Sequence, residues 1–119
     1  MIIYRNLVIG GIRMSRSMFY ITAESMEDAE QLAKQLVEDR LVACVNVIPK
    51  IKSFFYWEGE AQSEEEVLLF GKTKTETVSK LVERVKELHP YDVPCVVTWE
   101  MKDGNPDFLK WIDDEVNQC

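Results

Sequence analysis

The sequence is poor in the residues that bind metals and form covalent cross-links. Its 119 residues include one histidine, His89, and three cysteines, at positions 44, 95 and 119. The cysteines are odd in number and lack the C-x-x-C spacing of zinc and redox sites, so we expect reduced thiols in a cytoplasmic protein. No apolar run approaches the roughly 20 residues of a membrane-spanning helix, so we expect no membrane partner.

Positive charge is also scarce. Fourteen Lys and Arg residues stand against 21 Asp and Glu residues, a formal net charge of −7. An acidic surface repels phosphate backbones, so we expect no nucleic-acid partner. The sequence has no glycine-rich phosphate loop, no nucleophile elbow and no H-E-x-x-H motif, so we expect a protein that is not an enzyme.

The most informative feature is a long β-ribbon from Val42 to about Lys74, with a turn at Gly59. Its first arm, Val42 to Glu58, would reach about 55 Å at about 3.3 Å per residue. A compact domain of this length has a diameter of about 35 Å. The ribbon should therefore extend beyond its own domain, and its apolar part needs cover from another copy. We expect an obligate oligomer.

The remaining elements follow from apolar periodicity and from capping residues. The order is β-α-β-β-α-β plus a C-terminal helix, the α+β class with a ferredoxin-like plait. We expect one domain over residues 17–119, preceded by an N-terminal extension over residues 1–16. The expected elements outside the ribbon are a strand at 18–23, a helix from Ser25 to about Arg40, a helix ending before Pro90, a strand at 95–101 and a helix begun by Asn105, Pro106 and Asp107.

In this plait the fourth strand lies beside the first. The end of the first strand, Ile21 to Glu24, should therefore approach the loop from His89 to Cys95. We expect distant polar residues to converge there.

Five ordered segments resemble the CutA family of divalent-cation tolerance proteins. They are LVACVNVIP (41–49), YWEGE (56–60), EVLLFGKT (66–73), HPYDVP (89–94) and GNPDFLKWI (104–112). The resemblance implies a homotrimer whose long hairpins pair between subunits and a role in tolerance of copper and other divalent metals. It also implies a likeness to PII signalling proteins in fold and assembly, and it brings no settled reaction. Some copper-associated members carry a cysteine and paired histidines where this chain has Ile21 and Leu88-His89, and the family usually has a glutamate where this chain has Cys95.

His89 and Cys95 are the candidate metal ligands. An imidazole beside a thiolate suits Cu(I) or zinc, and Glu24 or Asp92 could add an oxygen ligand. The alternatives are a histidine that interacts with the last carbonyls of its helix and a cysteine packed in the core. We expect Cys44 to fill the core.

A second candidate site lies in the crevices between subunits. Tyr56, Trp57 and Tyr91 are the aromatic residues expected to line such a crevice, with interface packing as the alternative. Lys72 stands on an apolar strand, so its charge must reach solvent or a carboxylate. Glu58 or Asp92 of a neighbouring subunit could be that carboxylate, or Lys72 could hold a small anionic metabolite.

These observations favour a cytoplasmic homotrimer that contributes to divalent-metal homeostasis, with weak direct metal binding. One alternative is a PII-like regulatory module that binds a small metabolite between subunits. Another is a structural trimer that acts by interaction and has no ligand. Fold likeness alone does not decide among these functions.

Overall fold

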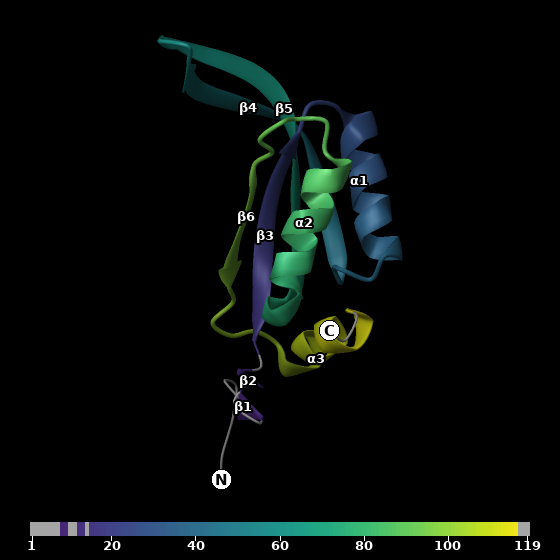
Figure 1. Cartoon of the computed structure of the whole chain (residues 1–119). Coiled ribbons are helices and arrows are strands. Elements are labelled where there is room, and N and C mark those ends of the chain that lie inside the picture. Colours follow the sequence, from purple (N-terminus) through teal and green to yellow (C-terminus); the bar gives the residue numbers. More distant parts are fainter. Residues whose placement is uncertain (1–7, 10–11, 14, 117–119) are drawn as a thin grey trace.

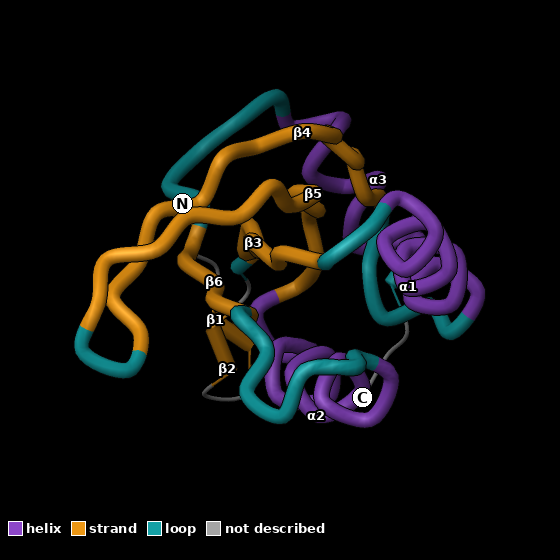
Figure 2. Tube along the Cα trace, turned by 90° about the horizontal axis from the view of Figure 1, so that it is seen from above, coloured by secondary structure: helices purple, strands orange, loops and turns teal. Residues whose placement is uncertain are grey.

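The computed structural model describes residues 8–9, 12–13 and 15–116. A four-stranded antiparallel sheet, in the order β4-β5-β3-β6, carries helices α1 and α2 on one side (Figures 1 and 2). The predicted α+β architecture is confirmed. Its elements are β3 (Arg16–Ala23), α1 (Met26–Glu38), β4 (Cys44–Trp57), β5 (Glu60–Lys74), a 3-10 turn (Thr75–Thr77), α2 (Val78–Leu88), β6 (Val96–Glu100) and α3 (Pro106–Glu115).

Two very short strands, β1 (Val8–Ile9) and β2 (Ile12–Arg13), pair antiparallel ahead of this sheet. Cys119 lies outside the described residues. No helix in the described ranges is long and apolar enough to cross a membrane.

The helices begin where the capping residues predict. The side chain of Ser25 accepts a hydrogen bond from the Asp28 backbone N–H at 3.2 Å, which satisfies one of the free donors in the first turn of α1. Asn105 does the same for the Asp107 N–H at 3.0 Å, and Pro106 opens α3. The predicted starts of both helices are confirmed.

The ribbon is the longest element of the molecule. Strands β4 and β5 have 14 and 15 residues, and their register shifts between Ile48 and Ile51, where Pro49 interrupts the ladder and Lys50 has a φ of 63°. The turn uses Glu58 and Gly59, with φ values of 51° and 80°. Figure 1 shows the ribbon extending away from the helices. The described chain measures 55 × 28 × 23 Å, so the predicted overhang is confirmed.

The core lies between the sheet and helices α1 and α2. Phe19 and Leu69 project from the sheet and are fully buried against these helices. Gly71 lies directly under the Phe19 ring. A Cβ atom at position 71 would stand 2.4 Å from Phe19 Cζ and 2.3 Å from the backbone oxygen of Cys44. A glycine is required there because of this close approach.

The opposite side of the sheet is also apolar, and neither α1 nor α2 covers it. The ring of Phe70 lies 6.5 Å from that of Tyr20 and 5.8 Å from that of Trp99, measured between ring centroids. Trp99 is 45% exposed in a single chain. We call this surface the open face; register and strand alternation assign it Tyr20, Ile48, Leu68, Phe70, Val97 and Trp99.

Candidate functional site

The loop after α2 meets the end of β3, as the strand order predicts. His89 is buried, and its Nε2 lies 2.7 Å from the backbone oxygen of Thr22. A carbonyl only accepts, so Nε2 carries the proton and donates. Nδ1 accepts from the Tyr91 backbone N–H at 3.1 Å. The imidazole is therefore the neutral Nε2–H tautomer and ties the loop to β3.

This arrangement differs from the predicted alternative in which His89 interacts with the last carbonyls of its helix. The ring does not bond to the last carbonyls of α2, because it turns toward Thr22 instead. Both ring nitrogens are occupied by backbone partners, so a metal could be ligated only after one of these bonds breaks. His89 acts here as a structural tie between the loop and the sheet.

The other predicted metal ligands lie at the surface. Cys95, Glu24 and Asp92 are exposed. Within the described ranges, no group of three or more His, Cys, Asp or Glu residues could hold a metal ion. A site formed by these four residues within one chain is therefore not found, and metal binding at them stays a prediction.

Neither Cys44 nor Cys95 is fully buried in the core. Cys95 is exposed because the alternation of β6, continued back by one residue, places it on the side of the exposed Val97 and Trp99, whereas Val96 packs against the core. The prediction that it packs in the core is wrong. Cys44 is only partly buried and lies opposite Lys72 in the β4–β5 register, on the side of the open face.

Tyr91 connects the loop to the base of the ribbon. Its hydroxyl donates to Glu66 Oε2 at 3.1 Å, and its ring lies 4.6 Å from the His89 ring between centroids. Desolvation raises the pKa of the phenol well above its usual value, and the Glu66 carboxylate, with Glu24 and Glu64 nearby, adds to the rise. Tyr91 is thus a neutral hydrogen-bond donor at physiological pH.

The predicted crevice residues are not assembled within one chain. Tyr56 and Trp57 are 74% and 60% exposed at the ribbon tip, beside Glu58 in the turn. Tyr56 pairs with Ala61, and Lys72 follows eleven residues later on β5, roughly 35 Å away along the strand. Only a second copy could bring the tip of the ribbon near a Lys72 side chain. The crevice stays a prediction.

Lys72 has a partner that the sequence did not indicate. Its Nζ lies 5.8 Å from the centroid of the Phe108 ring on α3, within the range of a cation–π contact. The lysine remains partly exposed at the edge of the open face. Its predicted carboxylate partner and anionic ligand both require another molecule.

Comparison with known proteins gives a consistent match over the sheet and its helices. The model of the family described as CutA1 divalent ion tolerance protein matches residues 17–115. The divalent-cation tolerance protein CutA of Thermus thermophilus is 48% identical over 92 residues, which are 77% of this chain and 89% of that protein.

Two solved structures share the fold. CutA1 from Oryza sativa is 35% identical with a TM-score of 0.87, over 88% of this chain and 96% of that one. The CutA protein of Archaeoglobus fulgidus, described as periplasmic, is 42% identical with a TM-score of 0.82, over 86% and 99%.

Proposed function

The chain belongs to the CutA1 divalent ion tolerance family, and we propose that it contributes to divalent-cation tolerance, including that of copper, as a cytoplasmic homotrimer. The family match over residues 17–115 supports the tolerance function, and the open face together with the overhanging ribbon supports the assembly. Apolar surfaces of this extent are typical of protein–protein contacts. The family and its relatives are named for tolerance and not for a reaction, so we propose no catalytic activity.

The arrangement of the sheet supports a ring of copies. Strands β4 and β6 are the two edges of the sheet, and they present different surfaces. Contact between unlike surfaces is heterologous, and such contacts close into rings when the rotation allows. Three is the smallest ring in which each copy gives its ribbon to one neighbour and receives a ribbon from the other.

Metal binding is proposed as weak and shared between copies. One chain offers an exposed thiol at Cys95 and exposed carboxylates at Glu24 and Asp92, but no complete ligand set among its described residues. A resident metal centre therefore does not fit a single chain. Copper or zinc would be cargo, held by the soft Cys95 sulfur with ligands from a second copy.

Calorimetric titration with Cu(I), Cu(II) and Zn(II) tests this reading. We expect saturable Cu(I) uptake that the substitution Cys95→Ser weakens about tenfold, since a thiolate is the softest ligand available. Cys44→Ser is the matched control and should leave uptake unchanged. Equal uptake by the Cys95→Ser protein, or no uptake by the parent, would remove direct metal binding at this cysteine.

For His89→Ala, metal uptake must be measured together with folding. Because His89 bonds to Thr22 and Tyr91, its loss should loosen the loop whether or not metal binds there. Metal uptake that persists in a folded His89→Ala protein would assign the histidine a structural role only. Loss of uptake with unchanged folding would restore it as a ligand.

A PII-like regulatory function is the second candidate, favoured by Lys72. Lys72 is partly exposed at the edge of the open face, where a ribbon tip from a neighbour could form a crevice for a small anionic metabolite. A panel of phosphorylated and carboxylated metabolites, titrated against the parent and Lys72→Gln proteins, tests it. If neither the metals nor the metabolites bind in these titrations, a trimer that acts only by interaction with other proteins would be favoured.

A further inference from the structure

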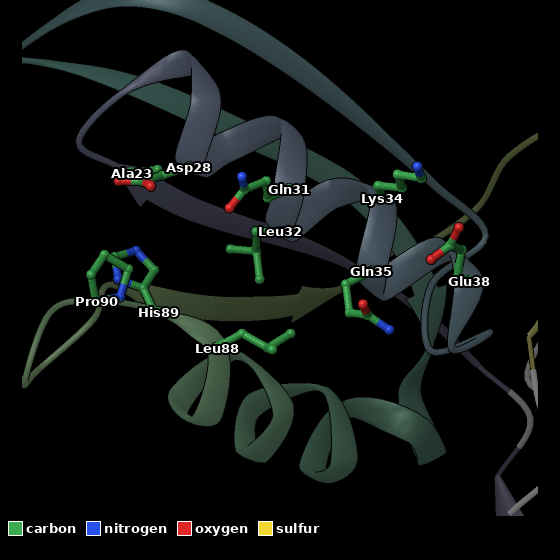
Figure 3. Close-up of a pocket in the computed structure, with 10 residues that line it drawn as sticks. All are labelled: Ala23, Asp28, Gln31, Leu32, Lys34, Gln35, Glu38, Leu88, His89 and Pro90. Carbon is green, nitrogen blue, oxygen red and sulfur yellow. The ribbon is translucent and has the colours of Figure 1, made fainter.

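A cavity of about 400 Å³ lies between α1 and α2, on the side of the sheet opposite the open face. Figure 3 shows Leu32 pointing into the gap from α1 and Leu88 reaching along it from α2. His89 and Pro90 lie together at one end. A volume of this size is typical of sites for small molecules.

The cavity has an apolar floor and an end wall of fixed geometry. Ala23 and Leu32 are 1% and 6% exposed, whereas Leu88 is 38% exposed. The His89 ring is held by its bonds to Thr22 and to the Tyr91 N–H, so the wall is formed before any ligand arrives. Leu88 is a large apolar side chain at the surface that an aliphatic ligand could cover, with a gain of about 25 cal/mol per Å² of buried area.

The polar rim is made mostly of hydrogen-bond acceptors. Asp28 and Glu38 contribute carboxylates, and Gln35 contributes an amide whose Nε2 is already engaged with Asp39 Oδ1 at 2.9 Å. Its amide oxygen remains to accept. Neither carboxylate forms an ion pair with another described residue. Lys34 is the one cation among the lining residues, so the rim has a net negative charge.

The two carboxylates stand at opposite ends of the cavity (Figure 3). Asp28 and Glu38 are ten residues apart on one helix, about 15 Å along its axis. Leu32 lies between them, whereas Ala23 lies at the Asp28 end. A complementary ligand therefore has a cationic donor at each end and an aliphatic chain in the middle.

We propose that this cavity binds a linear aliphatic polyamine. One ammonium group would bond to the carboxylate of Asp28 and the other to that of Glu38, while the methylene chain packs on Leu32 and Leu88. Charge-assisted hydrogen bonds are the strongest available to such a ligand, and the net charge of −7 draws it toward the protein. The site uses residues of one chain only, so it does not depend on assembly or on metal binding.

Titration calorimetry with spermidine tests the proposal on the full chain. We expect one saturable site per chain that persists at about 150 mM salt, because the methylene chain would be buried on Leu32 and Leu88 even though salt screens the exposed Glu38 carboxylate. Glu38→Gln should weaken binding about tenfold by removing one charge-assisted bond. Glu30→Gln is the matched control, since Glu30 is an exposed acid of the same helix outside the cavity, and it should bind like the parent.

A variant that blocks the cavity and a neutral analogue of the ligand test the site further. Leu88→Arg places a guanidinium over the cavity and should abolish spermidine binding, and circular dichroism checks that this variant folds. A neutral alkanediol of matched length should not bind. Equal weakening by Glu30→Gln and Glu38→Gln, or heat that vanishes with salt in every variant, would show only diffuse attraction to an acidic surface and would overturn the site.

Discussion

Replacing Gly71 with alanine adds only one methyl group, but it should destabilise the fold strongly. The added Cβ would lie 2.3 Å from the Cys44 backbone oxygen and 2.4 Å from Phe19 Cζ, both about 1 Å inside ordinary contact. The first neighbour is the backbone of β4 and the second is a fully buried ring, so neither can yield without moving the sheet or the core. Overpacking of this kind typically costs about 1–3 kcal/mol.

The net effect follows from two opposing terms. Displacing Phe19 would also forfeit part of the roughly 1.5–3 kcal/mol that its burial contributes. Alanine regains about 0.5–1 kcal/mol over glycine within a strand because the unfolded chain has less freedom to lose. We expect a net loss of about 2–4 kcal/mol in the free energy of unfolding.

Urea unfolding followed by tryptophan fluorescence, at one fixed protein concentration, measures this loss. A slope of about 1–3 kcal/mol per molar urea converts it to a midpoint roughly 1–2 M lower. Gly104→Ala is the control, because its Cβ would meet only the flexible end of the Leu109 side chain, at 3.3 Å. A Gly71→Ala midpoint equal to that of the control would refute the packing argument.

Three further predictions follow from the described contacts. Thr73→Val removes the 2.7 Å hydrogen bond from a fully buried hydroxyl to the Leu41 carbonyl. The free energy of unfolding in urea should fall by about 1–2 kcal/mol, and an unchanged midpoint would contradict this. The raised pKa of Tyr91 favours the neutral phenol in the folded state, so its stabilising contribution is complete below about pH 10 and declines as the pH rises through the folded pKa. In an absorbance titration Tyr91→Phe should therefore leave the phenolate signal of the folded protein below about pH 11 unchanged; a clear fall in that signal would contradict the raised pKa of Tyr91. Phe70→Arg places a charge on the open face and should weaken assembly roughly tenfold or more. Val37→Arg, on the exposed side of α1, is the control and should leave assembly unchanged. Equal effects of the two substitutions would exclude the open face as the interface.

Sequence reasoning recovered the elements whose signals are local. Ser25 and Asn105 mark the starts of their helices because their side chains bond to the next turn of the same helix. The approach of the His89 loop to the end of β3 came from strand order, which depends on the whole fold and needs no side-chain detail.

The side-chain contacts of the site could not be predicted from local sequence signals. The bonds from His89 to Thr22 and from Tyr91 to Glu66 join residues 67 and 25 positions apart, and they depend on how a loop turns. The core alternative for Cys95 failed because the pairing of β6 with β3 turns Val96 toward the core, which leaves Cys95 on the side of the exposed Val97 and Trp99, and that pairing is not visible in a short apolar run. The predicted crevices require a neighbouring copy, so one chain cannot contain them.

Sedimentation velocity of the purified full-length chain at micromolar concentration tests the central claim most directly. A chain of 13.9 kDa whose open face and ribbon are covered by two other copies should sediment as one species of about 42 kDa. Dilution over a hundredfold range should leave that species intact if assembly is obligate. A folded 13.9-kDa monomer across the same range would contradict the account, because the aromatic face of the sheet would then stand uncovered in water.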